Sequence, residues 1–146
     1  MANKITWDSN PSPVTLLDSE LDSIPTEGSV LSGVIDNSTG VDTVIDFELY
    51  LAEQASARSA GACVDIYLVS SIDGTNYPGP AIGEPSINTI VGSFAFSAAV
   101  DAERDVIKNI TLSPGLHKVY IKNRTGQTLA SASNTLKYRV YSLEVQ

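Results

Sequence analysis

The stretch 42–52, DTVIDFELYLA, decides the fold, because its side chains alternate between apolar and polar. The apolar positions are Ile45, Phe47, Leu49 and Leu51, and the positions between them are Asp46, Glu48 and Tyr50. Successive side chains of a β-strand point to opposite faces of a sheet. A period of two therefore predicts a strand with one buried face and one solvent face.

Similar strand signals recur along the rest of the chain. They lie at VLSGVID (30–36), VDIYLVS (64–70), INTIVGSFAFSA (87–98), DVIKNITL (105–112), LHKVYIKN (116–123) and NTLKYRVYSLEV (134–145). Seven or eight strands joined mostly by turns predict an all-β protein, an antiparallel two-sheet β-sandwich. Jelly-roll and immunoglobulin-like topologies both fit, because periodicity does not choose between them.

The first 29 residues differ from the remainder, so we divide the chain into an N-terminal arm, 1–29, and a β-sandwich domain, 30–146. The arm holds three prolines and scattered apolar side chains without regular alternation. It either packs on its own domain as an edge strand or reaches a neighbouring molecule. The alanine-rich segment 52–62 is also open, since it suits a short helix ended by Gly61 or a surface loop.

Charge and cysteine content exclude several classes of partner and site. The formal net charge is −8, from 17 acidic and nine basic residues, and no Lys/Arg cluster offsets it. Such a chain repels a phosphate backbone, so we expect no nucleic-acid partner. Cys63 is the only cysteine, which rules out an intrachain disulfide and a four-cysteine zinc site. We find no signal peptide or membrane span, so we expect synthesis in a reducing cytoplasm and no membrane partner.

Catalytic patterns are weak. His117 is the only histidine and lies in phase with Val119 and Ile121, which favours a partly buried structural role. No G-x-S-x-G nucleophile motif is present, and Cys63 opens an apolar strand, where cysteine behaves as a small hydrophobe. Acidic residues are plentiful, but no spacing marks a glycosidase pair. We therefore expect no enzyme activity, no catalytic residues, no cofactor and no metal.

The segment 70–80, SSIDGTNYPGP, contains residue types that occur in calcium loops. Its spacing lacks the alternating acids and the distal glutamate of an EF-hand loop. Asp-Gly is a favoured turn dipeptide, since glycine accepts positive φ and the aspartate side chain can bond to the backbone beyond it. We predict an ordered turn at Asp73 and Gly74, with Tyr77 pinning the loop to the sheet. Ligand contact is the alternative.

Three stretches carry a family resemblance: LLDSELDSIPTEGSVLSGVIDNSTG (16–40), VDIYLVSSIDGTNYPG (64–79) and LSPGLHKVYIKNRTGQTLASASNTLKYRVYSLEV (112–145). In this order they resemble the capsid decoration (cement) proteins of tailed bacteriophages, which have a jelly-roll-like β-sandwich. The shared features include an S-x-DG-x-N-Y loop, a P-G turn before a lysine-bearing strand and a tyrosine-rich last strand.

The resemblance implies a structural virion protein, assembled in the host cytoplasm, that binds the outer surface of a phage capsid. Its partner would be the major capsid protein, with the decoration protein itself a dimer or trimer that cements neighbouring subunits. Our candidate interaction residues are Trp7, Leu16, Leu17 and Leu21 in the arm and Asp73, Asn76 and Tyr77 in the loop.

The alternative function is a glycan- or receptor-binding β-sandwich module of a virion fibre or spike. A sugar-binding face needs exposed aromatic side chains in a row. Tyr50, Tyr67, Tyr120 and Tyr138 would form such a row if their strands were neighbours.

If the arm makes the capsid contact, deletion of residues 1–25 should abolish binding to undecorated capsids, because it removes the apolar anchors. Co-sedimentation with capsids measures this. Unchanged binding would contradict a role for the arm.

Overall fold

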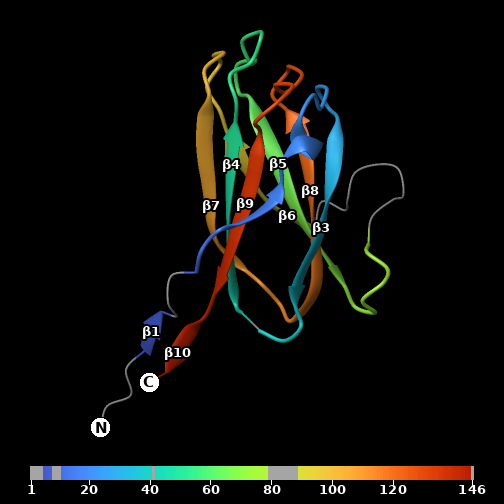
Figure 1. Ribbon diagram of the computed structural model, residues 1–146, viewed down its shortest axis with the longest axis vertical. Coiled ribbons are helices and arrows are strands. Elements are labelled where there is room, and N and C mark those ends of the chain that lie inside the picture. The colour runs from blue at the N-terminus through green and yellow to red at the C-terminus, as the bar shows by residue number, and fades with distance from the viewer. Residues whose placement is uncertain (1–4, 8–10, 41, 79–88, 146) are drawn as a thin grey trace.

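The computed structural model describes residues 5–7, 11–40, 42–78 and 89–145 (Figure 1). Within these residues the regular structure is almost entirely β-strand, with a 3-10 turn, η1, at Ser19–Leu21. The strands are β1 (Ile5–Trp7), β2 (Val14–Leu17), β3 (Ser29–Asn37), β4 (Val44–Leu51), β5 (Cys63–Ser71), β6 (Ile90–Ala95), β7 (Glu103–Thr111), β8 (Gly115–Arg124), β9 (Thr135–Tyr141) and β10 (Leu143–Val145).

Two antiparallel four-stranded sheets pack face to face (Figure 1). One has the order β2-β9-β4-β7 and the other the order β3-β8-β5-β6. From β2 to β9 the chain passes to the opposite sheet at every connection except β5 to β6. Eight strands in this order form a jelly roll. The predicted all-β sandwich is confirmed, and the topology favours the jelly roll over the immunoglobulin arrangement.

The core lies between the sheets and is built from the inward positions of the alternating strands. On β4 these are the four apolar residues of the opening stretch, all fully buried. The facing sheet contributes Val64, Ile66, Phe94, Val119 and Ile121. The alternation along β4 therefore fixes which of its faces enters the core and which faces solvent.

The N-terminal segment packs on its own sandwich, one of the two alternatives that the sequence left open. Residues 14–17 form the edge strand β2, paired antiparallel with β9. Leu17, Leu21 and Ile24 are buried members of the core. Deletion of residues 1–25 would therefore remove side chains of the hydrophobic core together with any partner contacts of the arm. A deletion of residues 1–13 leaves β2 and the core in place.

A buried asparagine in β8 links this segment to the sandwich. Asn123 is fully buried in β8, and its Nδ2 donates hydrogen bonds to the carbonyl oxygens of Ile24, Pro25 and Gln127 at 3.0, 3.1 and 2.7 Å. Its Oδ1 accepts from the backbone and hydroxyl of Thr125. These bonds hold the chain in the turn between η1 and β3, where no strand pairing is available.

The alanine-rich segment 52–62 is a loop between β4 and β5, which decides the second open alternative. The amides of Gln54 and Arg58 donate to the carbonyl oxygens of Val100 and Ala99 in the β6–β7 connection. The Arg58 side chain is buried and forms an ion pair with Glu103 at 3.0 Å. Backbone pairing to a neighbouring loop thus replaces the hydrogen bonds of a helix.

Outside the sandwich, β1 and β10 pair with each other as a two-stranded ribbon (Figure 1). Trp7 lies opposite Leu143 in this ribbon. Among the described residues, no helix is long and apolar enough to cross a bilayer.

The burial of the N-terminal segment can be tested by truncating one side chain. Leu21→Ala should lower the free energy of unfolding by about 2–5 kcal/mol, since Leu21 is 0 % exposed and the cavity left behind adds to the lost burial. Leu31→Ala is the matched control: Leu31 is 48 % exposed, and its loss should cost about 1 kcal/mol or less. Urea unfolding measures both, and equal losses would contradict the core position of Leu21.

Candidate functional site

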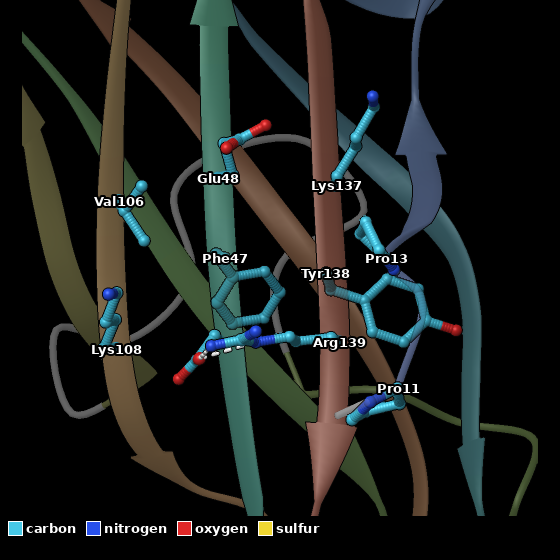
Figure 2. A pocket seen from close by; sticks show the side chains of 10 residues that line it. Pro11, Pro13, Phe47, Glu48, Val106, Lys108, Lys137, Tyr138 and Arg139 are labelled. Carbon is cyan, nitrogen blue, oxygen red and sulfur yellow. Dashed lines mark hydrogen bonds and ion pairs between the residues drawn. The ribbon is translucent and has the colours of Figure 1, made fainter. Parts of the chain in front are cut away.

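A cleft of about 270 Å³ opens on the outer face of the β2-β9-β4-β7 sheet (Figure 2). Strands β4 and β9 form its floor, the segment before β2 forms one side, and β7 forms the other. Its lining residues are Pro11, Pro13, Asp46, Phe47, Glu48, Val106, Lys108, Lys137, Tyr138 and Arg139. It combines charged groups of both signs with proline and valine side chains.

Asp46 is the most highly connected group in the cleft. It lies directly opposite Arg139, whose Nη2 and Nε approach its Oδ2 to 2.8 and 2.9 Å. Its Oδ1 accepts a hydrogen bond from the Tyr141 hydroxyl at 3.0 Å and from the Asn109 amide at 2.9 Å. The Asn109 amide becomes available because the β4–β7 register shifts here and Asn109 adopts a φ of 61°.

These bonds set the charge of Asp46. Burial by itself raises the pKa of Asp46, but the hydrogen bonds from Asn109, Arg139 and Tyr141 and the charge of Arg139 outweigh it, and the pKa lies below its usual value of 3.8. Asp46 is therefore ionised at neutral pH and acts as a fixed acceptor.

The second acid of the cleft, Glu48, binds Arg104 from β7 with a 3.0 Å ion pair. The Arg104 guanidinium also lies 5.3 Å from the centre of the Tyr50 ring, and that of Arg139 lies 5.7 Å from the Tyr141 ring. Each outward tyrosine of these strands is thus engaged by an arginine through a cation–π contact.

Two lysines line the same cleft without closing an ion pair. Lys137 lies opposite Glu48 on β9, and Lys108 extends from β7 on the other side of β4 (Figure 2). Neither ammonium group is within 4.0 Å of a carboxylate in the described part of the chain. The cleft consequently offers two uncommitted donors beside two carboxylates that arginines already engage.

The arm residues predicted as interaction sites are spread over three environments. Leu17 and Leu21 are buried in the core, which leaves their side chains no surface for a partner. Leu16 is partly buried in β2, and Trp7 belongs to the terminal ribbon. The arm contributes to the cleft through residues that the sequence did not single out, Pro11 and Pro13.

The loop residues Asp73, Asn76 and Tyr77 form an ordered turn, as the sequence predicted. Oδ1 of Asp73 accepts hydrogen bonds from the amides of Thr75 and Asn76 and from the Ser71 hydroxyl, while Oδ2 accepts from Nδ2 of Asn76. The bonds from Asn76, then Thr75 and Ser71, hold the pKa of Asp73 far below its usual range. Its oxygen atoms are occupied by the turn itself, and Gly74 has the expected positive φ of 75°.

The four tyrosines considered as a sugar-binding row do not lie on one face. Tyr67 and Tyr120 meet edge to face on the β3-β8-β5-β6 sheet, with ring centres 5.7 Å apart. Tyr50 and Tyr138 belong to the other sheet, and Tyr138 packs partly against the core. Tyr77 lies on the same face as Tyr67 and Tyr120, because the centre of its ring is 4.7 Å from the Lys118 ammonium group.

His117 is a structural residue, as predicted. It is 1 % exposed, its Nε2–H donates to the Ser113 carbonyl at 2.8 Å, and its Nδ1 accepts from the Ser70 hydroxyl at 2.8 Å. Burial, reinforced by the neighbouring Asp65 charge, raises the pKa of the Cys63 thiol, which disfavours a reactive thiolate. Among the described residues, no group of three histidine, cysteine or acidic side chains could hold a metal ion.

Comparisons with known proteins identify the fold. No protein-family model matches the chain, and no curated protein matches it significantly in sequence. The chain is similar to the CBM36-1 domain of a multidomain xylanase from the hindgut metagenome of Trinervitermes trinervoides, with a TM-score of 0.50, 12% identity and coverage of 94% of this chain and 97% of that one.

Two further solved structures are similar at lower scores. A CBM35 module from Paenibacillus barcinonensis has a TM-score of 0.41 and 10% identity over 94% of this chain and 97% of that one. Desmodium yellow mottle tymovirus has a TM-score of 0.38 and 11% identity over 100% and 91%. The similarity to the CBM36-1 domain, at 12% identity, agrees with the jelly-roll sandwich, and the phage decoration family stays a prediction.

The central position of Asp46 can be tested through the pH dependence of stability. Asp46→Asn should lower the free energy of unfolding at pH 6 by about 1–3 kcal/mol, because a charged acceptor becomes neutral. The folded pKa is depressed, so this contribution is present above 3.8 and is lost as the pH falls through the folded pKa. The difference between wild type and variant should therefore shrink at pH 3.

Urea unfolding at the two pH values measures that difference. Glu48→Gln, which removes a more exposed ion pair, should cost about 1 kcal/mol or less and serves as the control. A difference that stays constant between pH 6 and pH 3 would contradict the depressed pKa of Asp46.

Proposed function

We propose that this protein is a non-catalytic carbohydrate-binding domain and that a sugar chain binds in the cleft between the Pro11–Pro13 segment and β7. The observation that carries the proposal is the arrangement of donors and acceptors along the cleft floor. Sugar hydroxyls both donate and accept hydrogen bonds. Glu48 supplies an acceptor, while Lys108 and Lys137 supply donors, all within one cavity.

Apolar side chains in the cleft suit the C–H faces of a sugar ring. Pro11 and Pro13 lie on the β2 side and Val106 on β7, so that apolar surface flanks the charged floor (Figure 2). Small-molecule sites combine apolar walls with a few fixed polar groups. The ion pair between Asp46 and Arg139 holds such groups in place before a ligand arrives.

The similarity to the CBM36-1 domain supports the same function. It extends over nearly the whole length of both chains. At 12% identity it supplies the fold, and the chemistry of the cleft supplies the reason to expect a sugar.

The state of Asp46 supports binding without cleavage. A glycosidase needs a carboxyl group whose raised pKa lets it donate a proton at neutral pH. Asp46 has a lowered pKa and an arginine partner, which suit an acceptor and not a general acid.

Capsid binding is the second candidate, and one observation favours it besides the sequence resemblance. Leu31 and Val34 are each 48 % exposed on β3, beside Tyr120 and Lys118 of β8. Exposed apolar surface of this kind suits a protein partner, here the major capsid protein on a virion surface. This apolar face lies on the sheet opposite the cleft, so the two functions can be tested separately.

The first experiment is a glycan array probed with the full chain, together with co-sedimentation on undecorated capsids. We expect binding to a defined set of glycans. Capsid binding without any glycan binding would overturn the carbohydrate proposal and favour the cement function.

The second experiment fills the cleft. Val106→Trp should weaken binding of the best array ligand at least about tenfold, because Val106 lines the cleft and is 39 % exposed, so that a larger side chain can occupy the sugar's space. Val34→Trp makes the same change on the opposite face and should leave the affinity unchanged. Isothermal titration calorimetry measures both variants. If the Val106→Trp and Val34→Trp variants bind with equal affinity, the ligand binds outside the cleft.

A further inference from the structure

We infer that the cleft selects anionic glycans, sugar chains that carry carboxylate or sulfate groups, and that Lys108 and Lys137 recognise the anionic group. This inference rests on the proposed carbohydrate function and specifies its ligand class. It rests on the charges of the two lysines, which form no ion pair with the acids of the cleft.

The acids of the cleft are already neutralised. Asp46 is paired with Arg139 at 2.8 Å and Glu48 with Arg104 at 3.0 Å. Among the residues that the structure describes, Lys108 and Lys137 then add two positive charges that no carboxylate engages. The chain as a whole carries −8, so these two positive charges run against the overall charge.

The two lysines are placed to act on one ligand. They come from β7 and β9, the strands on either side of β4, and both line the cleft, with the Lys137 side chain running from β9 toward β2 (Figure 2). Neighbouring strands lie about 4.8 Å apart, and Lys108 lies two residues beyond Val106, which is level with Lys137, so the two side chains start more than about 10 Å apart and border the cleft from opposite sides of β4.

The chemistry favours a sparsely charged chain over a dense polyanion. A nucleic acid presents a phosphate at every residue, and the −8 charge of the protein would oppose its approach. A glycan with occasional acidic groups meets the lysines while its hydroxyls meet Glu48. A lysine ammonium group is a point charge that pairs with carboxylate and sulfate alike, so both anionic groups belong to the predicted class.

The experiment uses an array of matched glycan pairs, in which uronate-containing and sulfated oligosaccharides stand beside neutral counterparts of the same linkage. We expect the anionic members to bind at least about tenfold more tightly than their counterparts at low salt, with the preference falling as salt rises. Comparison of the uronate-containing with the sulfated oligosaccharides shows which anionic group is preferred.

The variants connect the preference to the lysines. The Lys108→Gln/Lys137→Gln double variant should lose at least about tenfold in affinity for the best anionic ligand while its melting temperature stays close to that of the wild type. Lys118→Gln removes one charge from the opposite sheet and should leave the affinity unchanged.

The outcomes separate the two proposals. Binding to neutral glycans without preference for anionic ones would overturn this inference and leave the carbohydrate function standing. Binding to no glycan would overturn both. Equal binding of a single-stranded oligonucleotide would overturn the inference by showing that any polyanion suffices, and so would an unchanged affinity in the double variant.

Discussion

The alternation along β4 is the constraint on which the rest of the molecule depends. Its inward side chains are fully buried in the core, and its outward side chains Asp46 and Glu48 form the floor of the cleft. A shift of one residue in this strand would exchange the two sets and place carboxylates in the core. The core and the cleft therefore both depend on the alternation along β4. The register of β4 with β9, which places Asp46 opposite Arg139, fixes both.

Local patterns in the sequence predicted local structure well. The period of two predicted the sandwich strands, and the turn at Asp73 and Gly74 followed from side chain–backbone bonds that span only three residues. The N-terminal segment was harder, because Leu17 and Leu21 show no alternation and are buried by strands distant in the sequence. The loop at 52–62 also depends on distant partners, since its amides bond to the β6–β7 connection.

The cleft could be predicted only in part. Asp46 and Glu48 stood out as solvent-facing acids, but solvent-facing acids are common on strands and their meaning depends on the neighbouring strand. A signal did exist: Lys137 and Arg139 alternate on the last long strand with the same period, and opposite charges facing each other stabilise paired strands. Pro11 and Pro13 gave no such signal, because their place beside the cleft is set by the pairing of β2 with β9.

The position of β2 in its sheet has a consequence for the order of events on the ribosome. Its partner β9 is synthesised only after β3 to β8, so the nascent N-terminal segment leaves the exit tunnel long before its place in the sheet exists. Leu17 and Leu21 are buried in the folded core, so their final packing depends on strands that follow them in the sequence. Completion of the β2-β9-β4-β7 sheet, and with it one wall of the cleft, is thus a strongly non-local step that requires β9.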